Sequence, residues 1–393
     1  MTEVQRYDVS AVRARFSSLT GGFAFFDGPA GTQVPDEVGN AIAGALRTAS
    51  ANYGAPYLTS CRVAAILEQA ERRAAAFIGA EADEITFGLN MTSLNFALTR
   101  QAARDWQPGD RVIISALDHD ANVAPWLELA HDAGLDLQTV GLNSDTTLDL
   151  GDLRSKLNGR TRAVAFTATS NAVGTRTPVA AIAEMAHSVG ALCWVDAVHA
   201  LAHTPLDVNQ LGADVLLSSS YKYCGPHLGF AYVRRAVAEH WRPYRVRLGR
   251  DLPTGRRLST GTFPYEQLAG LVATFDYLDS LGGMAALERY EQGLAEIFLA
   301  GLPDRISIYG MPTMQGRVPT FLISWPGLDA ARASEQLAER EIAVWGHDSW
   351  YSLGLYESGL IGNGTLRIGI SHYNTEQEVH KLLGALRELS AGA

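Results

Sequence analysis

Short apolar segments alternate with longer segments of helical periodicity between residues 85 and 233. The apolar segments show little alternation of polar and apolar positions, which is typical of parallel strands buried on both faces of a sheet. One intervening segment opens at Thr177-Pro178 and ends at Gly190, as a helix does when proline occupies its first turn. The predicted strands are 85–88, 111–115, 135–141, 163–168, 192–195, 215–217 and 228–233. This pattern predicts an α/β domain built around a mostly parallel sheet.

The two ends of the chain follow a different pattern. Residues 1–20 are polar and partly helical, and residues 265–300 predict long helices. A second set of short elements begins near residue 305, and its members are strands 306–309, 319–325 and 365–370 and helices 328–340 and 375–390. We therefore expect an N-terminal arm over 1–20, a large domain over 21–265, and interdomain helices with a small α+β domain over 266–393.

The composition of the chain limits its candidate binding partners and its cellular compartment. The 393-residue chain carries 32 lysines and arginines against 42 aspartates and glutamates, a formal charge of −10, and it has no long basic run. Nucleic acids and anionic membranes are therefore poor candidate partners. The apolar segments are shorter than a membrane span, and the first residues lack the apolar core of a secretory signal. Because Cys61, Cys193 and Cys224 lack the spacing of metal ligands, we expect a cytoplasmic protein with no disulfide framework and no metal site.

Residues with useful chemistry follow several predicted strands. Asp196 ends one strand, and Lys222 comes shortly after the next. A lysine amine can hold an aldehyde as a Schiff base, and a carboxylate can keep a pyridine nitrogen protonated so that the ring accepts electrons. Thr92, His119 and Asn171 also follow strands. Sites in parallel sheets lie beyond the carboxyl ends of the strands, so these five side chains are expected near one another.

A possible anion site follows the strand at 85–88. The polar turn Asn90-Met91-Thr92-Ser93 precedes a predicted helix that begins near residue 94. Free backbone N–H groups and the helix dipole favour an anion at such a start. The same residues also suit a helix N-cap, which is the commoner use of asparagine and serine there. The sequence leaves both interpretations open.

Two further motifs carry a resemblance to a known family. The segment SSYKYCGP at 219–226, together with VDAVH at 195–199, resembles the cofactor site of the class V aminotransferases, and within them the cysteine-desulfurase-like proteins. The resemblance runs over nearly the whole chain. It implies the PLP-dependent transferase fold of type I, with a mostly parallel seven-stranded sheet in a large pyridoxal phosphate (PLP)-binding domain and a small α+β C-terminal domain. It also implies a homodimer with a shared active site.

The resemblance assigns a role to each candidate residue. It implies that Lys222 carries PLP, that Asp196 holds the pyridine nitrogen and that His119 stacks on the ring; these are the expected catalytic residues. The cofactor-binding residues that it implies are Met91, Thr92, His119, Asn171, Asp196, His199, Ser219, Tyr221, Lys222, Gly261 and Thr262. His199 stands where desulfurases usually have glutamine, and Tyr221 replaces the histidine that usually precedes the lysine; both can still form hydrogen bonds.

Arg367, Tyr53, Tyr57 and Trp345 are the expected substrate-binding residues, and one further loop is expected to reach the cofactor of the partner subunit. RIGISHYNT at 367–375 resembles a family motif in which the arginine binds the substrate carboxylate, a group that a guanidinium matches with two parallel hydrogen bonds. Tyr53, Tyr57 and Trp345 are aromatic residues in predicted loops, where they either line a large pocket or pack the small domain. STGTFP at 259–264 resembles a loop that reaches the phosphate in the neighbouring subunit, so Thr262 is expected to complete the partner's site.

The expected reaction depends on a cysteine that is absent. Desulfurases carry a thiol in a loop that corresponds to residues 342–351, but Ser349 stands near that position, and a hydroxyl forms no persulfide. Cys224, close to Lys222, is either a packing residue or a substitute sulfur acceptor. We expect a PLP-dependent lyase that cleaves the Cβ–S bond of cysteine or an S-substituted cysteine. The alternatives are an aminotransferase, a decarboxylative deaminase or an epimerase, and a non-catalytic protein with the same fold.

Overall fold

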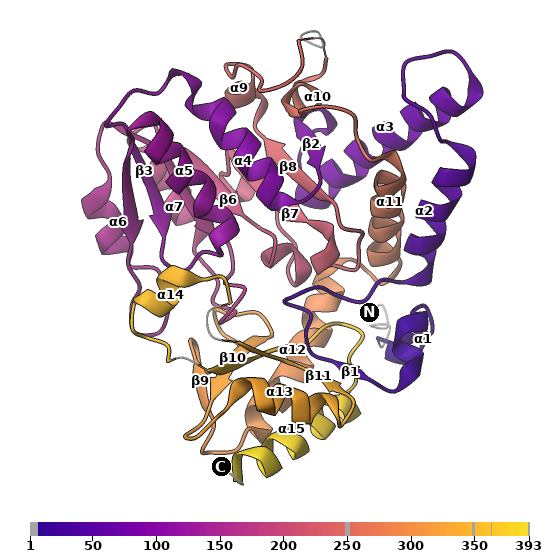
Figure 1. Cartoon of the computed structure of the whole chain (residues 1–393), viewed down its shortest axis with the longest axis vertical. Helices are drawn as coiled ribbons and strands as arrows, with labels where there is room; N and C mark the ends of the chain where they lie inside the picture. Colours follow the sequence, from indigo (N-terminus) through magenta and orange to yellow (C-terminus); the bar gives the residue numbers. More distant parts are fainter. Residues whose placement is uncertain (1–6, 248–251, 348–349, 363, 392–393) are drawn as a thin grey trace, which may run out of the picture.

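A computed structural model describes residues 7–247, 252–347, 350–362 and 364–391. Its centre is a seven-stranded sheet in the order β2-β8-β7-β6-β5-β3-β4 (Figure 1). Neighbouring strands run parallel except β8, which is antiparallel to β2 and β7. The strands are β2 (Ile85–Gly88), β3 (Arg111–Ser115), β4 (Asp136–Val140), β5 (Thr161–Thr167), β6 (Leu192–Asp196), β7 (Val215–Ser219) and β8 (Gly229–Val233). The predicted α/β fold with a mostly parallel seven-stranded sheet is confirmed.

Helices cover both faces of this sheet. Successive residues of β3 point to opposite faces: Ile113 lies in one apolar core, and Val112 and Ile114 lie in another. The first core also contains residues of α3 (Leu58–Ile78), α7 (Val179–His187) and α11 (Tyr265–Ser280), and the second contains residues of α4 (Met91–Ala102) and α5 (Ala124–Ala133). Two covered faces explain why the strand sequences are apolar without alternation.

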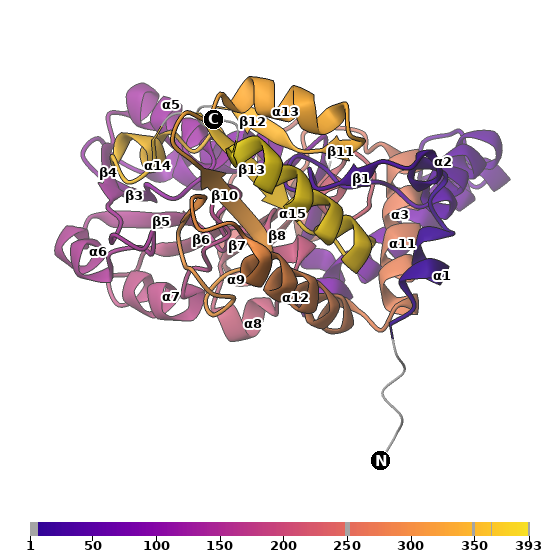
Figure 2. The ribbon, with the colours of Figure 1, turned by 90° about the horizontal axis from the view of Figure 1, so that it is seen from below.

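A smaller antiparallel sheet, in the order β12-β13-β10-β9, forms the C-terminal part (Figure 2). It has its own apolar core, which the helices α12, α13 and α15 complete. These elements are β9 (Ser307–Tyr309), β10 (Thr320–Ser324), β12 (Trp345–His347), β13 (Thr365–Gly369), α12 (Met284–Gly301), α13 (Ala330–Ala338) and α15 (Glu376–Ala391). The other helices are α1 (Val9–Arg13), α2 (Asp36–Thr48), α6 (Leu150–Lys156), α8 (Val208–Leu211), α9 (Arg235–Ala238), α10 (Thr254–Leu258) and α14 (Leu353–Glu357).

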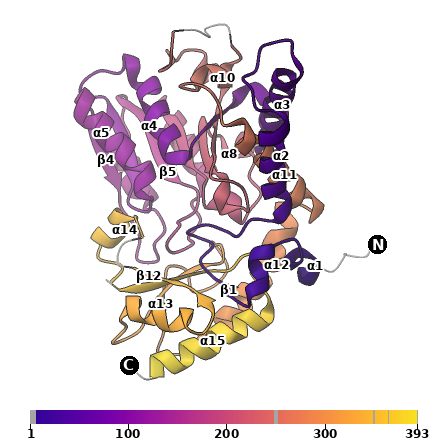
Figure 3. The same ribbon diagram turned by 45° about the vertical axis from the view of Figure 1, so that its right-hand side comes forward.

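The beginning of the described chain joins the C-terminal part. Strand β1 (Ala24–Phe25) pairs in parallel with β11 (Ile342–Ala343), and Figure 3 shows β1 among the orange and yellow elements. Ala24 and Phe26 are buried in the C-terminal core. The segment that follows therefore starts from the small sheet and runs toward the large one. The division into 1–20, 21–265 and 266–393 stays a prediction, and residues 1–6 of the arm lie outside the described residues.

Within the described residues, no helix combines the length and the apolar character that crossing a membrane requires.

Candidate active site

One cavity lies where the strands β5, β6 and β7 end. Of the predicted cofactor-binding residues, all except Gly261 and Thr262 line it, together with four residues that were not predicted. The lining residues are Met91, Thr92, His119, Ala121, Thr167, Thr169, Asn171, Asp196, Val198, His199, Ser219, Tyr221 and Lys222. The carboxyl edge of the sheet thus brings together residues that are far apart in sequence.

Lys222 closes a short 3-10 turn, Ser220–Lys222, directly after β7. Its Nζ donates to the backbone oxygens of Pro29 and Ala30, at 2.5 and 2.9 Å. Burial, and to a lesser extent the nearby guanidinium of Arg367, lower the pKa of Lys222 to about 7, while the carboxylates of Asp196 and Asp27 act in the opposite direction. A large fraction of this amine is therefore neutral near pH 7, as a nucleophile or a general base must be.

Asp196 is the last residue of β6 and is buried. Its Oδ1 accepts a hydrogen bond from the Val198 N–H at 2.9 Å, which holds the carboxyl group at the strand end. Burial raises the pKa of Asp196 to about 6, although the Val198 N–H and Lys222 lower it. The cavity thus contains a carboxylate that gains from a cationic or proton-donating partner.

His119 lines the cavity next to a short 3-10 turn, Asp120–Asn122, which it caps. Its Nδ1 accepts from the Ala121 N–H at 3.0 Å, so in the neutral ring the proton lies on Nε2. Burial lowers the pKa of His119 to about 4, and the cations of Lys222 and Arg367 add to this effect. At neutral pH the side chain is therefore an uncharged flat ring, suited to stacking on another ring.

The turn before α4 forms the helix cap that the sequence left open, and its position beside the cavity is compatible with the anion site. The Asn90 side chain caps the helix by accepting from the Ser93 N–H at 2.8 Å. The Met91 N–H takes no part in that cap. It donates to Ser219 Oγ at 2.9 Å, and both residues line the cavity. Gly229 allows the close approach of this turn, because a Cβ there would meet the Asn90 backbone at 2.4 Å. A helix N-terminus with hydroxyl groups beside it suits an anion, so the anion site stays a prediction that this geometry permits.

His199 and Asn171 lie on the side of the cavity that faces the small sheet. His199 Nε2 pairs with Oγ1 of Thr320, on β10, at 2.8 Å. Its buried Nδ1 has no hydrogen-bond partner among the described residues, so it remains available to a ligand. Asn171 instead has partners for both polar atoms: Nδ2 donates to Trp350 O at 3.1 Å, and Oδ1 accepts from Ser352 Oγ at 2.9 Å.

Arg367 lies on β13, buried beside the cavity but outside its lining. Its Nη1 donates to Asn171 O at 3.1 Å, and its Cζ lies 4.2 Å from the centre of the Trp350 ring. Burial lowers the pKa of Arg367 to about 9. Trp345 pairs with Arg367 in the β12–β13 register, but 49% of its surface is exposed.

Four predicted residues lie away from this cavity within one chain. Tyr53, Gly261 and Thr262 line a separate surface cavity of about 750 Å³, and Tyr57 is exposed. Ser349 lies outside the described residues. Their predicted roles stay predictions.

Cys224 is oriented away from the cavity. Its side chain is buried, and its Sγ lies 4.0 Å from His372 Nε2. Burial raises the pKa of Cys224 to about 12, so its thiol is protonated at neutral pH. No metal-binding group of histidine, cysteine, aspartate or glutamate is found in the described parts of the chain.

Sequence reasoning missed Ala121 and Val198, which lie close in sequence to the predicted His119 and His199, and two further groups of residues. Thr167 is the last residue of β5 and Thr169 follows it, close to the predicted Asn171, so the rule that sites lie at strand ends was sufficient to find them. Thr320, Trp350 and Ser352 come from the C-terminal part, and no local signal links them to the cavity.

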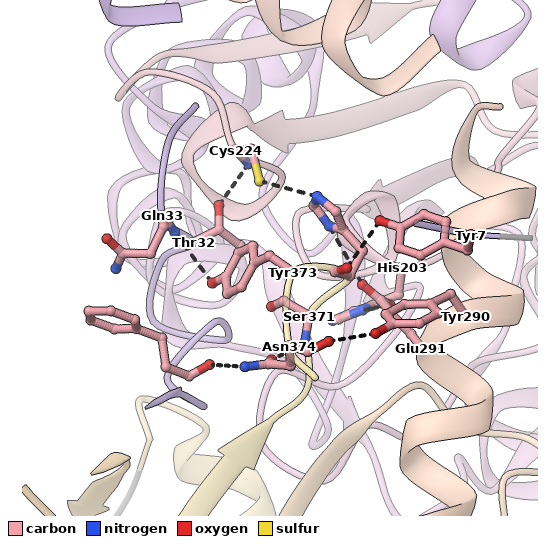
Figure 4. Close-up of polar contacts among 12 residues, drawn as sticks. Tyr7, Thr32, Gln33, His203, Cys224, Tyr290, Glu291, Ser371, Tyr373 and Asn374 are labelled. Carbon is pink, nitrogen blue, oxygen red and sulfur yellow. Dashed lines mark hydrogen bonds and ion pairs between the residues drawn. The ribbon is translucent and has the colours of Figure 1, made fainter. Parts of the chain in front are cut away.

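A buried polar cluster surrounds Glu291 (Figure 4), and it lines a second cavity that Lys222 also lines. Glu291, on α12, is 1% exposed, and its carboxylate accepts from His203 Nδ1 at 2.7 Å and lies 3.9 Å from His372 Nδ1. Tyr277 OH pairs with His372 Nε2 at 2.7 Å. Burial raises the pKa of Glu291, whereas His203 lowers it. The cluster connects α12 to the large domain, since His203 follows β6.

Glu291→Ala is expected to reduce the free energy of unfolding by about 3 kcal/mol, because it leaves the buried His203 without its partner and opens a cavity. The midpoint of urea-induced unfolding measures this loss. Glu288→Ala is the matched control on the same helix, because Glu288 pairs with Arg176 near the surface. That variant is expected to lose at most about 1 kcal/mol. Equal losses in both variants would contradict a special role of the buried carboxylate.

Comparisons with known proteins agree with this geometry. The sequence profile of the family described as aminotransferase class-V matches residues 24–382. A probable cysteine desulfurase of Mycobacterium leprae is 32% identical, covering 97% of each chain. An aminotransferase-like protein of Gibberella zeae is 31% identical, covering 97% of this chain and 98% of the relative.

Solved structures show the same architecture. The apo structure of a cysteine desulfurase from Thermococcus onnurineus superposes with a TM-score of 0.90 over 98% of both chains, at 26% identity. A cysteine desulfurase from Escherichia coli, at 24% identity, shares the fold with a TM-score of 0.86. With its profile match across nearly the whole length and its lysine and aspartate in one cavity at the sheet edge, this chain belongs to the class V aminotransferase family.

Proposed function

We propose that this protein is a PLP-dependent lyase that cleaves the Cβ–S bond of cysteine or of an S-substituted cysteine. Curated relatives named cysteine desulfurase, at 30% to 32% identity, support a carbon–sulfur lyase. The observation that carries the proposal is one cavity in which Lys222, with a pKa lowered to about 7, shares the lining with Asp196 and with the N-terminal turn of α4.

The side chains and backbone groups that line the cavity are chemically suited to PLP. The turn at Met91 and Thr92, with Ser219, offers donors to a phosphate, and the unpartnered Nδ1 of His199 is available to an oxygen of the ring. His119 provides an uncharged ring surface. When bound, PLP supplies an electron sink that stabilises negative charge on the α-carbon of an amino acid.

The protein's own residues supply proton transfer and orientation. We assign Lys222 to removing the α-proton of the substrate, because its lowered pKa leaves much of the amine neutral at pH 7. Asp196 would hold a proton on the pyridine nitrogen, where its buried carboxylate gains a charged partner. Arg367 would bind the substrate carboxylate through the edge of its guanidinium, since the Trp350 ring covers one face.

The cysteines favour elimination from an S-substituted cysteine over desulfuration. Of the three cysteines, none lines the cavity in the described structure: Cys193 and Cys224 are buried elsewhere, and Cys61 is exposed on α3. Desulfuration needs a thiolate to accept the sulfur atom. Elimination needs only a thiol that leaves with a proton, and water completes the conversion of the remaining fragment to pyruvate and ammonia.

The assembly and the compartment belong to the same proposal. We place Gly261 and Thr262 in the active site of a partner subunit, so that a homodimer shares its sites. Their position on a surface cavity with Tyr53 supports this assignment, because a neighbouring chain can reach it. We propose a cytoplasmic location, which the sparse and unpaired cysteines support.

Product analysis tests the reaction. Purified protein with PLP is expected to convert S-ethyl-L-cysteine to ethanethiol, pyruvate and ammonia, measured by a thiol reagent and by lactate dehydrogenase coupling. Alanine with sulfide or persulfide from L-cysteine would mean desulfuration instead. A 2-oxo acid that keeps the S-ethyl group would mean transamination. The Lys222→Ala variant is the control for reactions of free PLP.

A further inference from the structure

Aromatic rings form a continuous series from the surface to the active-site cavity. Trp345 stacks with Trp350, with ring centroids 6.3 Å apart, and His347 lies 5.7 Å from Trp350. His347 in turn stacks with Tyr351 at 6.2 Å. Tyr351 lies 5.6 Å from His119, which lines the cavity. All of these separations fall within the range in which aromatic rings attract one another. We call Trp345, His347, Trp350 and Tyr351 the aromatic series.

Hydrogen bonds fix the end of the series against the cavity. Tyr351 O accepts from the Asp120 N–H at 2.6 Å, next to His119. Trp350 O accepts from Asn171 Nδ2 at 3.1 Å, and Trp350 Nε1 donates to Thr365 Oγ1 at 2.8 Å. Trp350 and Tyr351 have φ angles of 53° and 54°, a left-handed conformation that bulky residues rarely adopt. The surrounding bonds maintain that conformation, so the position of the two rings is specified by the fold.

Trp350 and Tyr351 differ in how much of their side-chain surface is exposed. Trp350 is 2% exposed, and its ring covers one face of the Arg367 guanidinium. Its surface is therefore used in packing. Tyr351 is 61% exposed, although it lies beside a lining residue of the cavity. An aromatic side chain that is mostly exposed contributes little to the core, so packing of the small domain does not explain its position.

We propose that the aromatic series, through Tyr351, selects amino acid substrates whose β-substituent carries an aromatic ring, such as an S-benzyl or S-aryl cysteine. The inference rests on the proposed function of the cavity and names its substrate class. In this arrangement Arg367 and Lys222 bind the amino acid end of the substrate, and the β-substituent extends past His119 toward the exposed Tyr351. An aromatic ring there stacks on Tyr351, whereas a small alkyl group reaches few contacts.

Competition between two substrates tests the proposal on the holoenzyme. The ratio of kcat/KM for S-benzyl-L-cysteine to that for S-ethyl-L-cysteine is expected to exceed about 10, and Tyr351→Ala is expected to lower it about 5- to 10-fold. Tyr351→Phe keeps the ring and is expected to keep the ratio. Leu353→Ala is the matched control, because Leu353 is also half-exposed and close in sequence but lies outside the aromatic series. Its ratio is expected to equal that of the wild type.

A binding measurement separates this proposal from the proposed reaction. Both substrates are expected to perturb the visible absorbance of bound PLP when they bind, whether or not the C–S bond breaks, so their dissociation constants can be measured in either case. Tighter binding of the S-benzyl compound, lost in Tyr351→Ala, would support the selection of rings even if product analysis shows another reaction. A wild-type ratio near 1, or a ratio that Tyr351→Ala leaves unchanged, would overturn the proposal.

Discussion

Lys222→Ala is expected to abolish the visible absorbance of bound PLP and to reduce turnover of S-ethyl-L-cysteine by at least about 10³-fold. The change removes the amine that we propose to hold the cofactor covalently and to take the α-proton. The loss of absorbance and the loss of turnover are expected in the same variant, because Lys222 is the lysine that lines the cavity. Absorbance spectra after gel filtration, recorded beside the rate of thiol release, measure the two losses.

A surface lysine provides the control for that experiment. Lys381 lies on α15, 3.7 Å from Glu341 and far from the cavity lining. Lys381→Ala is expected to keep the spectrum and the rate of the wild type. A Lys222→Ala protein that retains the visible band would exclude the cofactor assignment. One that loses the band but keeps the rate would exclude the role of Lys222 in proton transfer.

Asp196→Asn is expected to reduce turnover by about 10²- to 10³-fold while PLP still binds, because the amide holds a proton on the pyridine nitrogen much more weakly than the carboxylate. PLP uptake by the apoprotein of this variant is expected to extend to lower pH than in the wild type. Asp196 raises the pKa of Lys222, which is about 7 in the wild type, so its loss lowers that pKa. Lys222 then stays neutral at lower pH.

Two measurements on this variant together distinguish electrostatics from misfolding. Stopped-flow uptake of PLP, followed from pH 5.5 to 8.5, is expected to reach half of its maximal rate at a lower pH than in the wild type. A misfolded variant would lose uptake at every pH. If turnover remained at the wild-type level, the assignment of Asp196 to the pyridine nitrogen would be wrong.

Much of the large domain could be predicted from local sequence. Val112, Ile113 and Ile114 are all apolar because successive side chains of β3 enter different cores, and that property is visible in a few consecutive residues. Strand ends are visible in the same way, as a change from apolar residues to Asp196 or to the hydroxyls before Lys222. Because parallel strands share a carboxyl edge, finding the ends was sufficient to bring most of the candidate residues into one cavity.

Only the tertiary structure decided the contacts between distant segments. His203 and Glu291 pair across 88 positions, and His199 pairs with Thr320 across 121. Neither pair has a spacing that a helix or a hairpin would impose, so no periodicity predicts it. The parallel pairing of β1 with β11 likewise depends on how the small domain packs.

The same reason separates the predicted cofactor residues from those that we propose to select the substrate. By itself, the sequence determined the sheet, its covered faces and the strand-end residues, because these follow from periodicity and from chemistry within a few residues. The tertiary structure alone decided that Trp350 covers Arg367, that Tyr351 lies beside His119 and that Cys224 is oriented away from the cavity. These positions depend on how the C-terminal part docks on the sheet edge, and docking is a sum of many packing contacts that no short segment of sequence contains.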